Sequence, residues 1–247
     1  MYKTSLSQFL AKNPFSYPLT LGFFYREKMR AIHHIAPNRP LQNILEVGGG
    51  ESGLTALLYP KARITNLDLN PLYTYAPCNQ QKRVRFVCGD ATALPFKSCF
   101  FDAVTLFDLL EHVPDHKKAI SEALRVLQPD GFLLVSSPNE NWRFPYYSFM
   151  KPICPNEAEM FEEWGHVRRG YSLHELEDLI RLPCKSYATF ITPVTVLCHD
   201  VSFSRLSPRL RRGICAVFSP ITWLGYVLHK PANTGTETAS AWQKAAK

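Results

Sequence analysis

The sequence predicts an α/β fold with a doubly wound, mostly parallel sheet of seven strands and helices on both faces. Short apolar runs alternate with segments of helical periodicity between residues 43 and 135. Three consecutive glycines, Gly48 to Gly50, directly follow the first apolar run. The 247 residues suffice for one such domain with insertions, and a hydrophobic content of 46% is ordinary for a globular protein.

The strands and helices of the core are predicted from periodicity. The apolar run Ile44–Val47 predicts a buried strand that ends in the glycine turn and leads into a helix. Four further apolar or β-branched runs predict strands at Ala62–Leu67, Val84–Cys88, Phe101–Phe107 and Phe132–Val135. Helical spacing predicts a helix over Asp115–Leu127, with Asp115 in its first turn, followed by a turn at 128–131. Ligands of such sheets bind at the carboxyl ends of the strands.

The segment 139–170 interrupts this alternation and is rich in aromatic residues and proline. Because it follows the carboxyl end of the fifth predicted strand, we expect it to lie over the ligand cleft. Ser172 and Glu175 form a capping-box pattern, which predicts that a helix starts there. β-branched residues predict one or two strands over 187–203, and a short final strand is expected over 237–242.

The chain divides into three expected segments. Residues 1–40 are rich in aromatic side chains, which form either a helical lid or a layer packed on the outer face of the sheet. Residues 41–204 form the ligand-binding core with its aromatic insertion, and residues 205–247 form a basic and apolar insertion followed by the final strand.

Cysteine spacing and the first residues indicate the compartment. The seven cysteines include no C-x-x-C pair, and none has a histidine at zinc-finger spacing, so no metal site is predicted. Their odd number and scatter are typical of reduced thiols. The first fifteen residues lack a long apolar core, so no signal peptide is expected. We therefore expect a cytoplasmic protein, with membrane association through the segment described next.

The net charge of +7 is concentrated in one segment. Residues 201–236 hold no Asp or Glu but include Arg205, Arg209, Arg211, Arg212 and Lys230. Residues 213–228 carry no charge, and these 16 residues are fewer than the roughly 20 needed to span a bilayer. Arginines beside an apolar stretch that holds tryptophan and tyrosine favour a segment lying in an anionic membrane interface. The alternative is a buried helical hairpin that caps the substrate pocket, and both interpretations suggest an apolar or lipid-like acceptor.

The glycine turn and its flanking acids indicate the kind of ligand. Gly48, Gly50 and Gly53 satisfy G-x-G-x-x-G, which lets a ligand approach bare backbone beside the unpaired N–H groups of a helix start. Asp68 follows Gly48 by 20 residues and is suited to accept ribose hydroxyls. Glu46 precedes the turn, where a carboxylate suits the ammonium and sulfonium of S-adenosylmethionine better than a pyrophosphate.

Five motifs in order resemble the class I S-adenosylmethionine-dependent methyltransferases, in the small-molecule branch that includes quinone-biosynthesis enzymes. They are ILEVGGGESG, ITNLDLNP, CGDATALPF, FDAVTLFDLLEHV and RVLQPDGFLLVSSPN, between Ile44 and Asn139. The resemblance implies a Rossmann-like sheet, S-adenosylmethionine as the cofactor and a small-molecule acceptor. We expect that acceptor to be apolar, lipid-like or glycan-linked rather than a nucleic acid.

The resemblance also implies roles for individual residues. Glu46 and the backbone of Gly48 and Gly50 would hold the methionine part of the cofactor. Asp68 would take the ribose hydroxyls. Leu69 would pack on the adenine, with Asp90 and Ala91 at its edge. Phe107 and Asp108, at the end of the fourth strand, would line the methyl-transfer face.

Two histidines are candidates for handling a proton of the acceptor. His112 follows Glu111 directly after the fourth strand and is the best candidate for a general base. The alternative is that His112 packs against the helix near Asp115 or caps it. His166 lies in the aromatic insertion and is a second candidate for contact with the substrate.

Three other functions are compatible with parts of the pattern. A nicotinamide-dependent oxidoreductase would share the glycine turn and Asp68, although Glu46 and Asp90 argue against it. A non-catalytic scaffold would keep the fold alone. A nucleic-acid methyltransferase is disfavoured, because no Asn/Asp-Pro-Pro-Tyr type of motif follows the fourth predicted strand.

Overall fold

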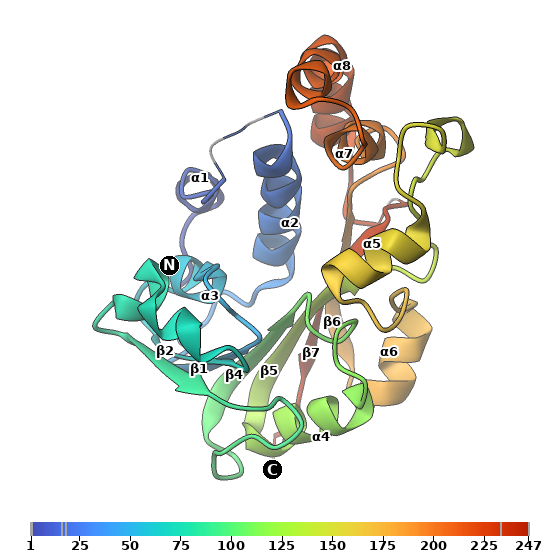
Figure 1. Cartoon of the computed structure of the whole chain (residues 1–247). Coiled ribbons are helices and arrows are strands. Elements are labelled where there is room, and N and C mark those ends of the chain that lie inside the picture. The colour runs from blue at the N-terminus through green and yellow to red at the C-terminus, as the bar shows by residue number, and fades with distance from the viewer. Residues whose placement is uncertain (1, 16, 18, 233, 247) are drawn as a thin grey trace.

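A single seven-stranded sheet organises the computed structural model, which describes residues 2–15, 17, 19–232 and 234–246 (Figure 1). The strands are β1 (Asn43–Val47), β2 (Arg63–Asp68), β3 (Val84–Cys88), β4 (Phe101–Phe107), β5 (Leu127–Pro138), β6 (Cys184–Phe190) and β7 (Glu237–Gln243). Their order is β3-β2-β1-β4-β5-β7-β6, and only β7 runs antiparallel to its neighbours among the described strands. This confirms the predicted doubly wound, mostly parallel sheet. Strands β2 and β3 are added on one side of β1, and the strands from β4 onward are added on its other side. Such a reversal of strand order leaves a crevice between β1 and β4, so a ligand is expected at their carboxyl ends.

Helices cover both faces of this sheet (Figure 1). The helices are α1 (Leu6–Leu10), α2 (Leu21–Ile35), α3 (Leu54–Leu58), α4 (His116–Val126), α5 (Glu157–Trp164), α6 (Leu173–Ile180), α7 (Val196–Ser202) and α8 (Pro208–Leu228), with 3₁₀ turns η1 (Pro71–Tyr75), η2 (Pro77–Gln80) and η3 (Ser148–Met150). Two hydrophobic cores result, one under α2 and α3 and one under α4 and α6. Successive residues of β1 alternate between them, since Ile44 packs in the first and Leu45 in the second.

Most predicted boundaries in the core agree with the structure, and two details differ. The turn 128–131 lies inside β5 as an irregularity, because Phe101 pairs with Leu127 while Ala103 pairs with Phe132. Asp115 precedes α4 as its N-cap, where its Oδ1 atom accepts a hydrogen bond from Lys118 N at 3.0 Å. The capping box of Ser172 and Glu175 at the start of α6 is confirmed.

The prediction of strands over 187–203 is wrong in its second half. β6 ends at Phe190, and α7 follows from Val196. The hydroxyls of Thr192 and Thr195 accept hydrogen bonds from each other's backbone N–H groups, at 3.1 and 2.8 Å, and thereby form a turn. Burial of one side of α7 against α2 and α8 then outweighs the strand preference of its β-branched residues.

The N-terminal segment both packs on the sheet and lines a cavity. Helix α2 contacts β6 and β7 and buries Phe23, Met29 and Ile32. Its Tyr25 and Lys28 side chains instead line a cavity of about 420 Å³ at the carboxyl ends of the strands. One side of α2 therefore packs on the sheet, and another side faces the cavity, where a lid was the alternative expectation.

Helix α8 exposes an apolar face. Its buried residues are Cys215, Thr222 and Tyr226, whereas Val217 is 75% exposed and Leu224 is 58% exposed. No residue of α8 lines the cavity that Tyr25 and Lys28 line. The alternative of a buried hairpin over the pocket is therefore wrong. Among the described residues, no helix combines the length and the apolar content that crossing a membrane requires.

Candidate functional site

Two cavities meet at His112, beyond the carboxyl ends of the parallel strands. The first has a volume of about 350 Å³ and lies at the ends of β1, β2 and β3, between Gly48 and Asp90. The second has a volume of about 420 Å³ and is enclosed by α2, α7, the aromatic insertion and the ends of β4 and β5. Because His112 lines both, molecules bound in the two cavities would lie next to each other.

The glycine turn gives the first cavity a bare backbone wall. Gly48 has a φ angle of +72°, and a Cβ atom there would lie 2.6 Å from Leu109 Cδ1. A Cβ atom on Gly49 would lie 2.6 Å from Glu46 Cγ. Glycine is therefore required at both positions. The Asn66 side-chain amide donates to the carbonyl of Gly50 at 3.0 Å and fixes the turn from below.

The structure brings together five of the residues predicted to bind a cofactor. Gly48, Asp68, Leu69, Asp90 and Ala91 all line the first cavity. Asp68 accepts a hydrogen bond through Oδ2 from Gly50 N at 3.0 Å, which ties the second strand to the turn. Leu69 is 70% exposed and free to pack against a ligand.

Two of the predicted residues lie behind the cavities. Glu46 is 2% exposed, and its Oε1 atom accepts a hydrogen bond from Thr55 N at 3.3 Å. Burial raises the pKa of Glu46 to about 7. Phe107 is buried in the core and lines neither cavity, contrary to its predicted place on the transfer face. Its side chain points away because successive residues of a strand face opposite sides.

Asp108 anchors the second cavity through an ion pair. Its carboxylate pairs with Lys28 of α2 and accepts a hydrogen bond from Ser136 Oγ at 2.6 Å. Burial is the largest single effect and opposes the charged form of both partners. The charge of the partner, the hydrogen bonds and the other nearby charges together outweigh it, so the pKa of Lys28 is raised and the pKa of Asp108 is lowered. This ion pair joins the N-terminal helix to the end of β4.

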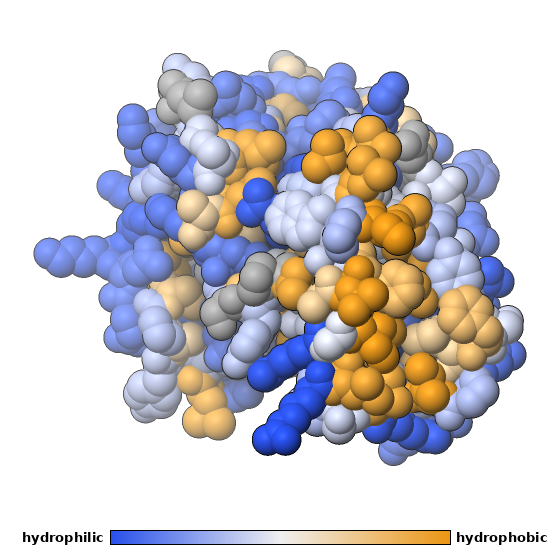
Figure 2. All heavy atoms as spheres, turned by 90° about the horizontal axis from the view of Figure 1, so that it is seen from above, coloured by the Kyte–Doolittle hydropathy of each residue, from blue (hydrophilic) through white to orange (hydrophobic). Residues whose placement is uncertain are grey.

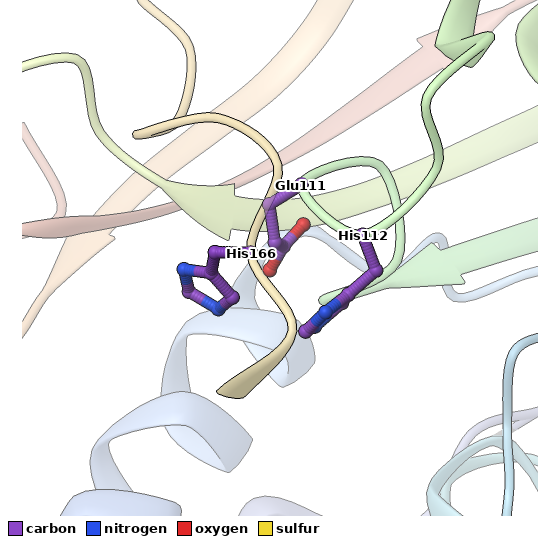
Figure 3. Close-up of side chains that lie close together, drawn as sticks. All are labelled: Glu111, His112 and His166. Carbon is purple, nitrogen blue, oxygen red and sulfur yellow. The ribbon is translucent and has the colours of Figure 1, made fainter. Parts of the chain in front are cut away.

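Glu111, His112 and His166 converge on one wall of the second cavity (Figure 3). The Arg168 guanidinium holds the two loops that carry them together, since it donates to the carbonyls of Leu110 and Val113 at 2.5 and 2.6 Å. The centroids of the two imidazole rings lie 4.8 Å apart in an edge-to-face arrangement. The histidines predicted as catalytic candidates thus lie side by side.

The surroundings set the protonation of this group. Burial, and then the negative charge of Asp108, raise the pKa of Glu111 well above its usual value. Burial and the neighbouring His112 lower the pKa of His166 to about 4, so its ring is neutral near pH 7. His112 Nδ1 lies 3.1 Å from the carbonyl oxygen of Gly165, which can only accept a hydrogen bond. The proton of a neutral His112 is therefore on Nδ1, and Nε2 keeps its lone pair.

The second cavity has largely aromatic walls. Phe24, Tyr25 and Trp164 come from the two segments expected to cover the cleft, whereas sequence reasoning missed Phe190 and Phe203. His199 also lines the cavity, and its Nδ1 atom lies 3.4 Å from Asp200 Oδ1. The His-Asp pair is visible in the sequence, but it falls in the segment where strands were predicted.

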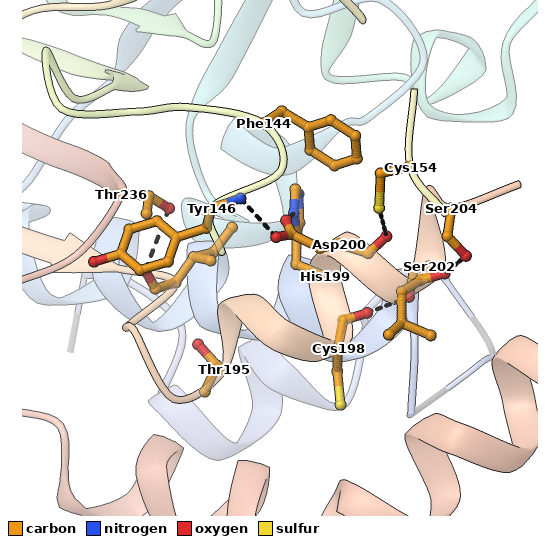
Figure 4. A network of polar contacts seen from close by, with 12 residues as sticks. Phe144, Tyr146, Cys154, Thr195, Cys198, His199, Asp200, Ser202, Ser204 and Thr236 are labelled. Carbon is orange, nitrogen blue, oxygen red and sulfur yellow. Dashed lines mark hydrogen bonds and ion pairs between the residues drawn. The ribbon is translucent and has the colours of Figure 1, made fainter. Parts of the chain in front are cut away.

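Asp200 holds the aromatic insertion against α7 (Figure 4). Its Oδ2 atom accepts a hydrogen bond from Tyr146 N at 2.7 Å, and its carbonyl accepts one from Cys154 Sγ at 3.7 Å. Asp200 is fully buried, so these bonds give partners to groups that water does not reach. The insertion is thereby fixed over the second cavity, as predicted from its position in the sequence.

Several known proteins that are similar to this chain are methyltransferases. The methyltransferase-domain family matches residues 45–135. A demethylmenaquinone methyltransferase of Renibacterium salmoninarum is 37% identical over 99 residues, which cover 39% of this chain and 41% of the relative. A ubiquinone/menaquinone biosynthesis C-methyltransferase UbiE of Cereibacter sphaeroides is 30% identical over 168 residues, covering 60% of this chain and 67% of the relative. The chain thus spans less than half of the first relative and two thirds of the second.

A solved structure with the same fold is the N-methyltransferase NodS from Bradyrhizobium japonicum in complex with S-adenosyl-L-homocysteine. The TM-score is 0.56 at 14% identity, and the match covers 97% of this chain and 96% of NodS. At this identity the likeness concerns the fold.

We predict that Gly48→Ala destabilises the protein by about 1–3 kcal/mol, because alanine is strained at a positive φ and its Cβ would displace Leu109. Gly213→Ala is the matched control. Gly213 lies in α8 with no atom within 4 Å of an added Cβ, so alanine should stabilise the helix by about 0.5–1 kcal/mol. Urea unfolding of both variants tests this, and equal stability changes would show that the turn is not strained.

Proposed function

Because the chain belongs to the class I S-adenosylmethionine-dependent methyltransferases, we propose that it transfers a methyl group from S-adenosylmethionine to a small, largely apolar acceptor. The observation that carries this proposal is the position of His112, which lines both cavities. The cofactor would occupy the first cavity and the acceptor the second. The sulfonium is already an activated leaving group, so in-line placement and exclusion of water would supply most of the catalysis.

In this proposal the cofactor lies along the ends of β1, β2 and β3. The methionine part rests on the backbone of Gly48 and Gly50, and the carboxylate of Glu46 behind them balances its positive charge. Asp68 exchanges its bond to Gly50 N for the ribose hydroxyls. Three residues of the same cavity take the adenine, namely Leu69, Asp90 and Ala91.

The acceptor would be an aromatic, lipid-linked molecule. The relatives named above act in quinone biosynthesis, and the walls of the second cavity include Phe24, Trp164 and Phe203, on which a planar ring can stack. We propose that His112 and His166 contact the acceptor near its reacting atom, with Asp108 at the same end of the cavity. Phe107 would support this end from the core.

We further propose that α8 holds the protein at an anionic membrane surface. Seen in Figure 2, hydrophobic side chains form a band across the end of the molecule that carries α8. The band includes exposed residues of α8 such as Val217, Ile221 and Leu224. Arg209 in the first turn of the helix and Lys230 beyond its last residue are both exposed. An apolar face between basic residues is suited to the boundary between acyl chains and anionic head groups.

The pKa of Glu46 gives a test of cofactor binding. With a pKa of about 7, Glu46 is largely protonated at pH 6, and a bound cation favours its charged form. We expect affinity for S-adenosylmethionine to rise with pH through 7 and binding at pH 7 to release a proton. Calorimetry in two buffers of different ionisation enthalpy measures that release.

Glu46→Gln should abolish the proton release and weaken binding by about ten- to a hundredfold, since a hydrogen bond to a charged group contributes about 1.5–3 kcal/mol. Glu51→Gln makes the same charge change at an exposed position of the same turn and should leave both unchanged. Absence of binding to the folded wild-type protein would refute the proposed function.

Methyl transfer itself should be detectable with labelled S-adenosylmethionine and demethylmenaquinone that is first chemically reduced to its dihydroxy form, since the oxidised ring is not a nucleophile. The organic-soluble fraction of a cell extract is assayed in the same way. Trp164→Ala should lower kcat/KM for the acceptor about tenfold, because it removes a wall on which the acceptor stacks. Phe149→Ala, at a 68% exposed position of the same insertion, should have no effect. Label confined to water-soluble products would contradict the apolar acceptor.

Membrane binding is tested by co-sedimentation with vesicles of phosphatidylcholine, with and without phosphatidylglycerol. We expect binding to the anionic vesicles that weakens with salt. Leu224→Asp should reduce it about tenfold or more by placing a charge on the apolar face. Leu72→Asp changes a similarly exposed leucine on η1, away from α8, and should bind like the wild type. A wild-type protein that stays in solution would exclude this surface as a membrane contact.

A further inference from the structure

Three side chains able to ligate a metal converge on the wall of the acceptor cavity. Glu111, His112 and His166 each offer one ligand atom, and these atoms all lie within 4.8 Å of one another. The two imidazole rings flank the Glu111 carboxylate (Figure 3). Donor atoms around one tetrahedral ion lie about 3.4 Å apart at bond lengths of about 2.1 Å. Side-chain movements that shorten the widest separation by roughly one ångström or somewhat more would therefore complete a site.

Two polar atoms of this cluster lack a partner. Glu111 is 1% exposed, and its Oε2 atom has no hydrogen-bond partner. The Nδ1 atom of His166 is also buried without a partner. Leaving such atoms unpaired costs free energy, and coordination to an ion would remove that cost for each atom that serves as a ligand.

The third ligand is already oriented. Nδ1 of His112 is engaged with the carbonyl of Gly165, so Nε2 is the atom available to a metal. A ligating histidine usually donates its other N–H to a carbonyl or carboxylate in this way. The hydrogen bonds from Arg168 to the carbonyls of Leu110 and Val113 join the loop of His166 to the loop of Glu111 and His112. These bonds hold the three proposed ligands in place in addition to the packing of their side chains.

The carboxyl groups of the cavity are also able to hold a cation. Asp108, Glu111 and Glu237 line it, together with Lys28 and three histidines. Lys28 is already paired with Asp108, which leaves the other two carboxyl groups without a cationic partner in the cavity.

We propose that Glu111, His112 and His166 bind one divalent transition-metal ion whose open coordination positions face the acceptor. Two nitrogen donors with one oxygen donor favour Zn²⁺, Co²⁺, Fe²⁺ or Mn²⁺ over Mg²⁺ and Ca²⁺, which prefer oxygen. The histidines then contact the acceptor through the ion.

The role of the ion rests on the proposed function. The ion binds a hydroxyl oxygen of the acceptor, and the O–H proton passes to water. An electron pair of the resulting anion forms the bond to the methyl carbon. The bond between that carbon and sulfur breaks, and its electron pair stays on sulfur.

The test titrates chelator-treated full-length protein with Zn²⁺ by calorimetry and with Co²⁺ by visible absorption, without S-adenosylmethionine. We expect one ion per chain and, for Co²⁺, ligand-field bands typical of nitrogen and oxygen donors. Glu111→Gln and His166→Ala should each weaken binding about a hundredfold. The control is His174→Ala, which removes an 82% exposed histidine within 3.6 Å of Asp178 on α6. It should leave the one-ion binding unchanged.

The outcomes separate this proposal from the proposed function. A wild-type protein that binds no ion, or binds one equally well after Glu111→Gln and His166→Ala, overturns the metal site, even if S-adenosylmethionine binds. Stoichiometric ion binding that both variants abolish supports the site, even if no methyl transfer is found. Thermal unfolding of each variant with and without Zn²⁺ guards against misfolding, since an intact site should raise the wild-type Tm alone among these three proteins.

Discussion

The Arg168 guanidinium joins two irregular loops, and the catalytic half of the molecule depends on that contact. It donates to three carbonyls of the loop after β4, those of Leu110, Val113 and Pro114. Buried carbonyls need a donor, and a cationic donor binds them more strongly than a neutral one. The contact brings His166 against His112, although the two belong to different segments of the chain. It also positions the insertion that forms the roof of the acceptor cavity.

The two cavities differ in how they are built, and this difference fits their proposed tasks. The first combines the backbone of the glycine turn with aliphatic side chains such as Leu67 and Leu109, and its Asp68 and Asp90 are held by backbone N–H groups. Such a wall is rigid and suited to one invariant ligand. The second is made of large aromatic side chains from α2, α7 and the insertion, around the ion pair of Lys28 and Asp108. Its shape depends on segments outside the sheet, so it can differ while the first stays the same.

Local patterns made the sheet and the cofactor cavity predictable from the sequence. The glycine turn, Asp68 and Asp90 each follow a strand directly, and a parallel sheet brings the ends of its strands to one edge. The acceptor cavity was less accessible, because it depends on contacts between distant segments. Nothing near Lys28 in the sequence indicates that it pairs with Asp108, and the role of Arg168 follows only from the folded loops. For Val196–Ser202, burial between helices decided against the strand that its residue types favour.

One buried carboxylate links the outer surface to the interior. Asp200 fastens the aromatic insertion to α7, and α7 packs against α8. The apolar helix on the outside is therefore connected through α7 to the insertion over the second cavity. A shift of α8 would reach the wall of that cavity through Asp200, although no residue of α8 lines it.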